Sequence, residues 1–140
     1  MEKQYLLKVY PARKSRVAWR KIEICGNDTL TDLCTIILDA FNFDHDHLYE
    51  FCMDNRPYSN NAYTIDRDAD YPEINIVIDT MELYEKQKFS LHYDFGDDWM
   101  FTITVSKMVE VQRDFKPRIV KAKGNIQQYP DWAEDEFDYE

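Results

Sequence analysis

A short acidic segment separates two stretches of alternating residues in the second half of the chain. The segment, Tyr93-Asp94-Phe95-Gly96-Asp97-Asp98-Trp99, holds three carboxylates and a glycine. Apolar and polar residues alternate over residues 89–93 before it and over residues 101–105 after it. This period of two is typical of strands that bury one face. The sequence therefore predicts a β-hairpin whose turn carries the three carboxylates.

A second hairpin and one long helix are predicted in the N-terminal third. Residues 5–10 and 17–25 have strand patterns, and the basic segment 11–16 between them begins with a proline, which favours a turn. Residues 29–42 have apolar side chains at helical spacing, and Asp28 or Thr29 is suited to be the N-cap. We expect this helix to pack on the sheet.

The remaining predicted elements are shorter. Residues 48–53 and the isoleucines between positions 74 and 78 have the composition of strands, and a polar loop joins them. Residues 80–87 are interpreted as a short second helix. Together these elements predict the α+β fold class, with a mostly antiparallel sheet, or a pair of sheets, packed against one long helix.

The length of 140 residues suits one domain. We assign residues 1–124 to this domain and residues 125–140 to an acidic aromatic tail, because the last ten residues carry six carboxylates. Repulsion among these charges favours fraying. The aromatic side chains of the same segment could instead anchor it on the domain or on a partner, and both interpretations stay open.

Cysteine usage and hydropathy indicate the cellular location. The three cysteines show no paired spacing and lie in apolar settings, which is typical of small buried side chains in a reducing compartment. No apolar run approaches the length of a membrane span, and the first ten residues mix charged with apolar side chains. We therefore expect a cytoplasmic protein without a membrane partner.

The net charge of −10 is unevenly distributed. Residues 1–21 carry seven basic and one acidic side chain, whereas residues 22–106 carry four basic and eighteen acidic ones. Residues 107–123 are basic again, with six basic and two acidic side chains. The two basic segments would form a phosphate-attracting patch if they were neighbours in the fold. Ordinary salt bridges to the acidic middle are the competing interpretation, and the overall charge opposes a direct nucleic-acid partner.

The acidic turn has two interpretations. Carboxylates in a turn commonly accept hydrogen bonds from their own backbone. They also suit hard cations such as Mg²⁺, while His45, His47 and His92 would suit a transition metal. No recognised ligand spacing is present, and no nucleophile has a supporting motif. We therefore predict no metal, no cofactor and no catalytic residue.

A binding role agrees better with these residue types. Aromatic side chains near the turn could form a cleft with an acidic rim, which would favour amine-bearing ligands or basic protein surfaces. The same rings could equally fill the core. The candidate binding residues are Asp46, His47, Glu50, Tyr93, Asp94, Asp97, Asp98 and Trp99.

Three motifs in the same order resemble those of the plasmid pRiA4b ORF-3-like family. They are Trp-Arg-Lys-Ile at 19–22, Asp-His-Leu-Tyr-Glu-Phe at 46–51 and the acidic segment at 93–99. The resemblance implies an association with plasmids and other mobile elements, and no established activity. Many members have a histidine near the position of Phe101 and end in a Pro-Glu-Asp-Cys-Gly-Gly-like segment, so roles that need those groups are not implied here.

These observations lead to one functional hypothesis and two alternatives. The leading hypothesis is a non-enzymatic binding module of a mobile-element-associated family, which holds a protein or a small ligand at the 97–99 turn and near His47 and Glu50. The first alternative is a metal-dependent phosphoesterase or nuclease that uses Asp46, Asp94, Asp97 and Asp98 with His47. The second is an acidic mimic of nucleic acid that inhibits a basic protein.

Overall fold

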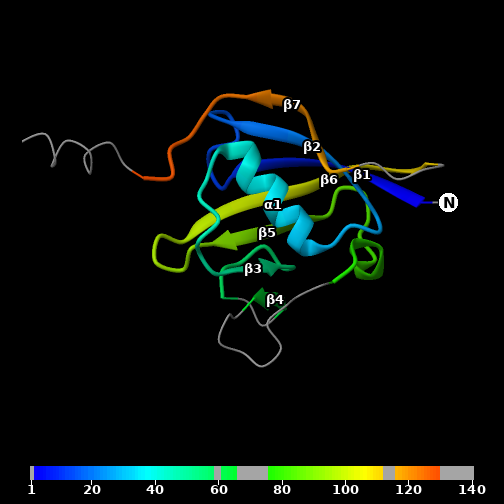
Figure 1. Ribbon diagram of the computed structural model, residues 1–140, viewed down its shortest axis with the longest axis horizontal. Coiled ribbons are helices and arrows are strands. Elements are labelled where there is room, and N and C mark those ends of the chain that lie inside the picture. Colours follow the sequence, from blue (N-terminus) through cyan, green and yellow to red (C-terminus); the bar gives the residue numbers. More distant parts are fainter. Residues whose placement is uncertain (1, 59–60, 66–75, 112–115, 130–140) are drawn as a thin grey trace, which may run out of the picture.

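A computed structural model describes residues 2–58, 61–65, 76–111 and 116–129 of the protein. Within these ranges one antiparallel sheet of seven strands is covered on one face by a helix, so the predicted α+β fold class is confirmed (Figure 1). The elements in chain order are β1 Glu2–Pro11, β2 Trp19–Cys25, α1 Leu30–Phe41, β3 Tyr49–Cys52, β4 Ala62–Ile65, η1 Ile78–Met81, β5 Lys88–Tyr93, β6 Trp99–Val111 and β7 Arg118–Lys123.

The strand order in the sheet is β4-β3-β5-β6-β1-β2-β7. Strands β4 and β7 form the two edges, and α1 crosses in front of the sheet (Figure 1). Strands from the two ends of the chain, β1, β2 and β7, therefore lie in one half of the sheet, and β3, β4 and β5 from its acidic middle form the other half. This arrangement follows from β1 pairing with β6 and from β2 pairing with β7.

Helix α1 has Thr29, one of the two predicted N-cap residues, as its N-cap, and it ends at a C-cap that was not predicted. The Thr29 hydroxyl accepts a hydrogen bond from Asp32 N–H, and the Asp32 carboxylate accepts one from Thr29 N–H, which is a capping box. Asn42 ends the helix with a left-handed backbone at φ 60°. The apolar positions of one helix face are all buried, so the predicted helix over residues 29–42 is confirmed.

The two predicted hairpins are also present. In the first, β1 pairs with β2 from Val9↔Arg20 to Gln4↔Cys25. In the second, β5 pairs with β6 from Tyr93↔Trp99 to Lys88↔Thr104, and the acidic segment forms the turn.

The sheet has one face toward α1 and one face away from it, which we call the inner and the outer face. Side chains alternate between them along each strand. On β5, Phe89, Leu91 and Tyr93 are fully buried in the core on the inner face. His92 therefore lies on the outer face, and its ring is fully buried as well.

Three local predictions need correction. The strand predicted at the isoleucines between positions 74 and 78 is absent from the described residues. Val77 makes only an isolated bridge with Thr29, and Ile78 already begins η1. Position 74 lies outside the described residues. The predicted second helix over residues 80–87 is a single 3-10 turn, because Glu82 adopts a left-handed backbone at φ 55° and ends it. Strands β4 and β7 were not predicted.

The described part of the predicted tail contacts the domain through Asn125, Ile126 and Gln128. Asn125 Oδ1 accepts a hydrogen bond from Arg20 at 3.4 Å, Ile126 packs against the core, and Gln128 Oε1 accepts one from Asp44 N–H at 2.7 Å. Residues 130–140 lie outside the described residues, so the division at residue 124 stays a prediction. Among the described helices, none has the length and apolar character needed to cross a bilayer.

Candidate functional site

The first carboxylate of the acidic turn supports the turn itself. Asp94 has a left-handed backbone at φ 64° and is buried. Its Oδ1 accepts hydrogen bonds from Gly96 N–H at 3.1 Å and from Asp97 N–H at 3.4 Å. The interpretation of a carboxylate that stabilises its own main chain therefore holds for Asp94.

The last carboxylate of the turn reaches the outer face of the sheet. Asp98 Oδ1 lies 2.6 Å from His92 Nε2 and accepts a hydrogen bond from the Tyr58 hydroxyl at 3.0 Å. The His92 hydrogen bond, followed by that of Tyr58, lowers the pKa of Asp98. The same Asp98 bond raises the pKa of Tyr58. Asp98 is thus held as an anion against a buried ring.

His92 has an acidic partner at each ring nitrogen. Its Nδ1 lies 2.7 Å from Glu50 Oε2, opposite the Asp98 contact, and Glu50 is itself only 4% exposed. Glu50 Oε2 also accepts a hydrogen bond from Tyr58 N–H at 2.8 Å. With two carboxylates at hydrogen-bond distance, each nitrogen must share a proton with its partner. We call Glu50, Tyr58, His92 and Asp98 the acid–histidine cluster.

The segment after β3 covers this cluster. The ring of Tyr58 meets the His92 ring edge-on at 4.8 Å between centroids, and Phe95 lies 4.9 Å from it on a tilted plane. Asn55 forms a short contact with Ser90 of β5, which is fully buried. Residues 53–58 therefore fold back over the outer face and exclude water from a polar part of the sheet.

A second polar cluster lies on the inner side of the same strand end. His47 Nε2 is 3.5 Å from Asp94 Oδ2 and 3.2 Å from the Tyr129 hydroxyl, and the His47 ring meets Tyr93 edge-on. The Tyr93 hydroxyl accepts a hydrogen bond from His47 N–H and donates one to the Asp44 carbonyl. Burial raises the pKa of Tyr93 and that of Tyr129.

The eight predicted binding residues therefore do not form one site. Glu50 and Asp98 belong to the outer face, whereas His47, Tyr93 and Asp94 belong to the inner side. Residues 92 and 93 are consecutive on a strand, so the two groups have the sheet between them. Of the other three, Asp46 and Asp97 are exposed and Trp99 is half-buried.

Trp99 lies between two hollows at this end of the sheet. Its ring stacks on Phe101 at 6.1 Å and meets Phe43 edge-on at 4.9 Å. One hollow has a volume of about 530 Å³ and is lined by Trp99, Asp97, Asp98, Lys14, Arg13, Asn55, Pro57, Met100, Thr102, Pro11 and Ala12. The other has a volume of about 700 Å³ and is lined by Trp99, Lys14, Val17, Asn125, Ile126, Gln127 and Gln128. Both hollows share Trp99 and Lys14, and together we call them the groove.

Sequence reasoning missed the central role of His92 and the basic side of the groove. The position of His92 on the polar side of an alternating strand was visible, because Ser90 and His92 interrupt the apolar residues. The burial of His92 was not visible in the sequence, because residues 53–58 cover its ring and its partner Glu50 is 42 positions away.

The two basic segments are neighbours in the fold. Lys8 pairs with Lys21 across β1 and β2, and Lys21 pairs with Lys121 across β2 and β7. The side chains of directly paired residues in an antiparallel sheet point to the same face, so the three lysines form a row on the outer face. The ammonium groups of Lys8 and Lys21 lie over the Trp19 ring at 5.4 and 5.7 Å from its centroid.

The fold and the site define a class of small α+β proteins in which an antiparallel sheet carries a buried acid–histidine cluster opposite its helix. The chain belongs to the plasmid pRiA4b ORF-3-like protein family, whose model matches residues 3–140. The resemblance seen in the three sequence motifs is therefore confirmed.

The fold is similar to that of a solved structure. The crystal structure of a protein of unknown function from Methanosarcina mazei Go1 matches with a TM-score of 0.71 and 25% sequence identity, over 99% of this chain and 81% of that one. No curated protein matches the chain.

Proposed function

We propose that the protein is a non-enzymatic binding module and that its groove binds an extended peptide segment of a partner protein. The observation that carries the proposal is the pair of adjacent hollows that share Trp99 and Lys14. An aromatic ring flanked by hollows is a common anchor for a bound chain, because it offers large contact area at low entropic cost.

The groove has side chains suited to peptide groups. Asn55 lines one hollow, and Asn125, Gln127 and Gln128 line the other. Each side-chain amide offers both a donor and an acceptor, as a peptide bond does.

The groove also has charges of both signs that the described part of the protein leaves without an ion-pair partner. They are Asp97, Arg13 and Lys14, which all line the first hollow. A ligand with both an amine and a carboxylate would match this distribution, whereas a uniformly charged polymer would meet repulsion. This supports a peptide over a nucleic acid. We place the module in the cytoplasm, as expected from its cysteine usage.

The two alternatives have less support. The phosphoesterase hypothesis needs Asp94, Asp98 and His47 in one centre, but Asp98 reaches the outer face and Asp94 contacts His47 on the inner side. The nucleic-acid mimic rests on acidic residues that include positions 130–140, which lie outside the described residues.

Selection from a random dodecapeptide display library against the purified full chain tests the proposal. We expect a shared sequence pattern among the selected peptides. Synthetic versions should lose about tenfold in affinity, or 1.4 kcal/mol, with Lys14→Glu and with Asp97→Lys.

Two matched variants serve as controls. Lys107→Glu and Glu110→Lys make the same charge changes at exposed positions of β6, outside the groove, and we expect affinities within twofold of the unmodified protein. Failure to enrich any peptide, or equal losses in the groove variants and the β6 variants, would overturn the proposal.

A further inference from the structure

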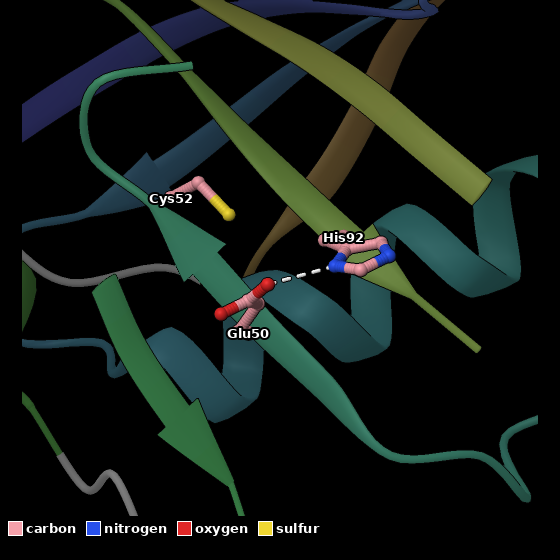
Figure 2. Close-up of side chains that lie close together, drawn as sticks. All are labelled: Glu50, Cys52 and His92. Carbon is pink, nitrogen blue, oxygen red and sulfur yellow. Dashed lines mark hydrogen bonds and ion pairs between the residues drawn. The ribbon is translucent and has the colours of Figure 1, made fainter. Parts of the chain in front are cut away.

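Three potential metal ligands lie together on the outer face of β3 and β5. Glu50 and Cys52 are two residues apart on β3 and so have the same face. Glu50 pairs directly with His92 on the neighbouring strand β5, and Cys52 pairs with Ser90. Figure 2 shows the three side chains directed toward the same space above the sheet, with α1 behind it.

The donor atoms of these residues are close enough to share one ion. A carboxylate oxygen of Glu50, Sγ of Cys52 and a ring nitrogen of His92 all lie within 4.8 Å of one another, and His92 Nδ1 is the nitrogen that faces Glu50. All three side chains are buried, with exposures of 4%, 0% and 0%. We propose that Glu50, Cys52 and His92 form a binding site for Zn²⁺, and none of these three ligands lines the groove.

The donor set selects the kind of ion. One thiolate, one imidazole and one carboxylate are the three ligand types that zinc uses in proteins. Mg²⁺ and Ca²⁺ require oxygen ligands almost entirely, so a sulfur and a nitrogen donor disfavour both. Three protein ligands leave one position for water or for an outside group.

The surrounding groups orient the ligands as in known zinc sites. Asp98 Oδ1 lies 2.6 Å from His92 Nε2 and accepts a hydrogen bond from it, which leaves Nδ1 directed toward Glu50. A carboxylate at the second nitrogen of a ligating histidine is the common outer-shell arrangement, since it fixes the tautomer and the ring. Tyr58 N–H does the same for Glu50, because it donates to Oε2 at 2.8 Å.

The charges of the site balance when the ion is bound. A thiolate and a carboxylate carry two negative charges, and Zn²⁺ neutralises both in a buried setting where unpaired charge is costly. Binding releases the Cys52 thiol proton and the proton shared between Glu50 and His92 Nδ1. The ion thus takes the place of a hydrogen bond that already links two of its ligands.

Only small movements are needed. Two ligands of a tetrahedral zinc lie roughly 3.4 Å apart, whereas Glu50 Oε2 and His92 Nδ1 are 2.7 Å apart. This pair must open slightly, and no donor pair is more than 4.8 Å apart. Changes of this size are of the order that side-chain rotation produces.

Titration of the full chain with Co²⁺ and with Zn²⁺, after dialysis against a chelator, tests the proposal. We expect one ion per chain by calorimetry and by metal analysis, together with a higher unfolding temperature. Co²⁺ should give a thiolate-to-metal charge-transfer band, and this band should disappear when Zn²⁺ displaces the Co²⁺. The band requires a cysteine ligand, so it distinguishes this site from carboxylates on the surface.

The other two buried cysteines provide matched controls. Cys52→Ser should abolish the charge-transfer band, whereas Cys25→Ser and Cys34→Ser should retain it. Asp98→Asn, at a half-exposed position, should weaken Zn²⁺ binding by about 10- to 100-fold and remains informative if Cys52→Ser does not fold.

An unmodified protein that binds no ion, or a charge-transfer band of equal strength in Cys52→Ser, would overturn the proposal. Peptide binding by the groove is measured in the presence of chelator, so the outcome there is independent of this result.

Discussion

The two ends of the outer face of the sheet differ in how they carry polar groups. On β3 and β5, Glu50 and His92 are buried under residues 53–58 and bonded to each other. On β1, β2 and β7, a row of lysines faces solvent with partial cover from Trp19. At the β3–β5 end the polar groups are few, and each has a fixed hydrogen-bond partner. At the other end the charges are numerous, and the lysines of the row have no fixed partner of this kind among the described residues.

This difference follows from the way the sheet orders the chain. The acidic middle of the sequence forms β3 and β5, and the two basic segments form β1, β2 and β7 on the other side of β6. The segregation of charge in the sequence thus becomes a segregation across one surface. The comparison of the two ends indicates that polar residues on a sheet stabilise it through burial and fixed hydrogen-bond partners more than through charge alone.

The largest expected effect comes from removing the buried ring. His92→Ala in metal-free protein leaves the Glu50 carboxylate buried without its basic partner, and breaking such a buried pair costs about 3–5 kcal/mol. We expect this loss in the free energy of unfolding, measured by urea denaturation followed by tryptophan fluorescence. Lys21→Ala at the other end should change it by less than about 0.5 kcal/mol. Similar losses in the two variants would break the comparison.

The second prediction compares two consecutive basic residues, Arg20 and Lys21, whose side chains point to opposite faces of the sheet. Arg20 is buried on the inner side, where its guanidinium donates to the carbonyls of Ala40 at 2.8 Å and Lys123 at 2.9 Å and lies over the Phe41 ring. Arg20→Lys cannot make both contacts, because one ammonium replaces a planar fork. We expect a loss of about 1–3 kcal/mol in the free energy of unfolding.

The control for that prediction is Lys21→Arg, which keeps the charge at a half-exposed outer position. We expect no measurable change in the denaturation midpoint. A midpoint for Arg20→Lys equal to that of the unmodified protein would show that the bonds from β2 to α1 and β7 add little to stability.

Much of the fold was visible in the sequence because its signals are local. Helix α1 has apolar periodicity together with a cap, Thr29 and Asp32, three residues apart. The β5–β6 hairpin alternates on both sides of an acidic turn, and the family motifs place it in the right context. These features depend on residues within a few positions of one another, which a single sequence records.

The parts that could not be predicted depend on distant contacts. All side chains of β7 are exposed, so this strand has no alternation of buried and exposed residues to detect. The residues before η1 have the composition of a strand, but the Asp28 carbonyl accepts a hydrogen bond from Ile78 N–H and turns the chain into η1. The acid–histidine cluster needs Glu50 and His92 on paired strands, which only the topology reveals.

A third prediction concerns a buried bond on the inner face of β1, one of the strands of the basic end. The Tyr5 hydroxyl, on β1, donates to Asp79 Oδ1 at 2.6 Å, and Tyr5 is 1% exposed. Tyr5→Phe removes this bond and should cost about 1 kcal/mol at neutral pH. An unchanged free energy of unfolding would show that burial with a fixed partner does not have the same effect at both ends.

The same tyrosine makes the stability depend on alkaline pH. Burial, with Asp79 as the second cause, raises the pKa of Tyr5 above its usual value. Above about pH 10 the unfolded chain loses this proton while the folded protein keeps it, so stability falls as pH rises. Denaturation at pH 9 and pH 11 should show a smaller fall for Tyr5→Phe than for the unmodified protein.

The smallest expected effect has the opposite sign. Lys21 lies between Lys8 and Lys121 in the lysine row, and like charges directly across strands destabilise a sheet. Lys21→Glu places an anion between two cations, so it should raise the free energy of unfolding by about 0.5 kcal/mol at low salt. Added salt should remove the gain, since exposed charges are screened, and Lys21→Gln should give a smaller gain because it only removes the repulsion. A loss of stability in Lys21→Glu would mean that the contact of the Lys21 ammonium with Trp19 outweighs the repulsion in the row, and the basic end would then resemble the buried end in depending on specific contacts.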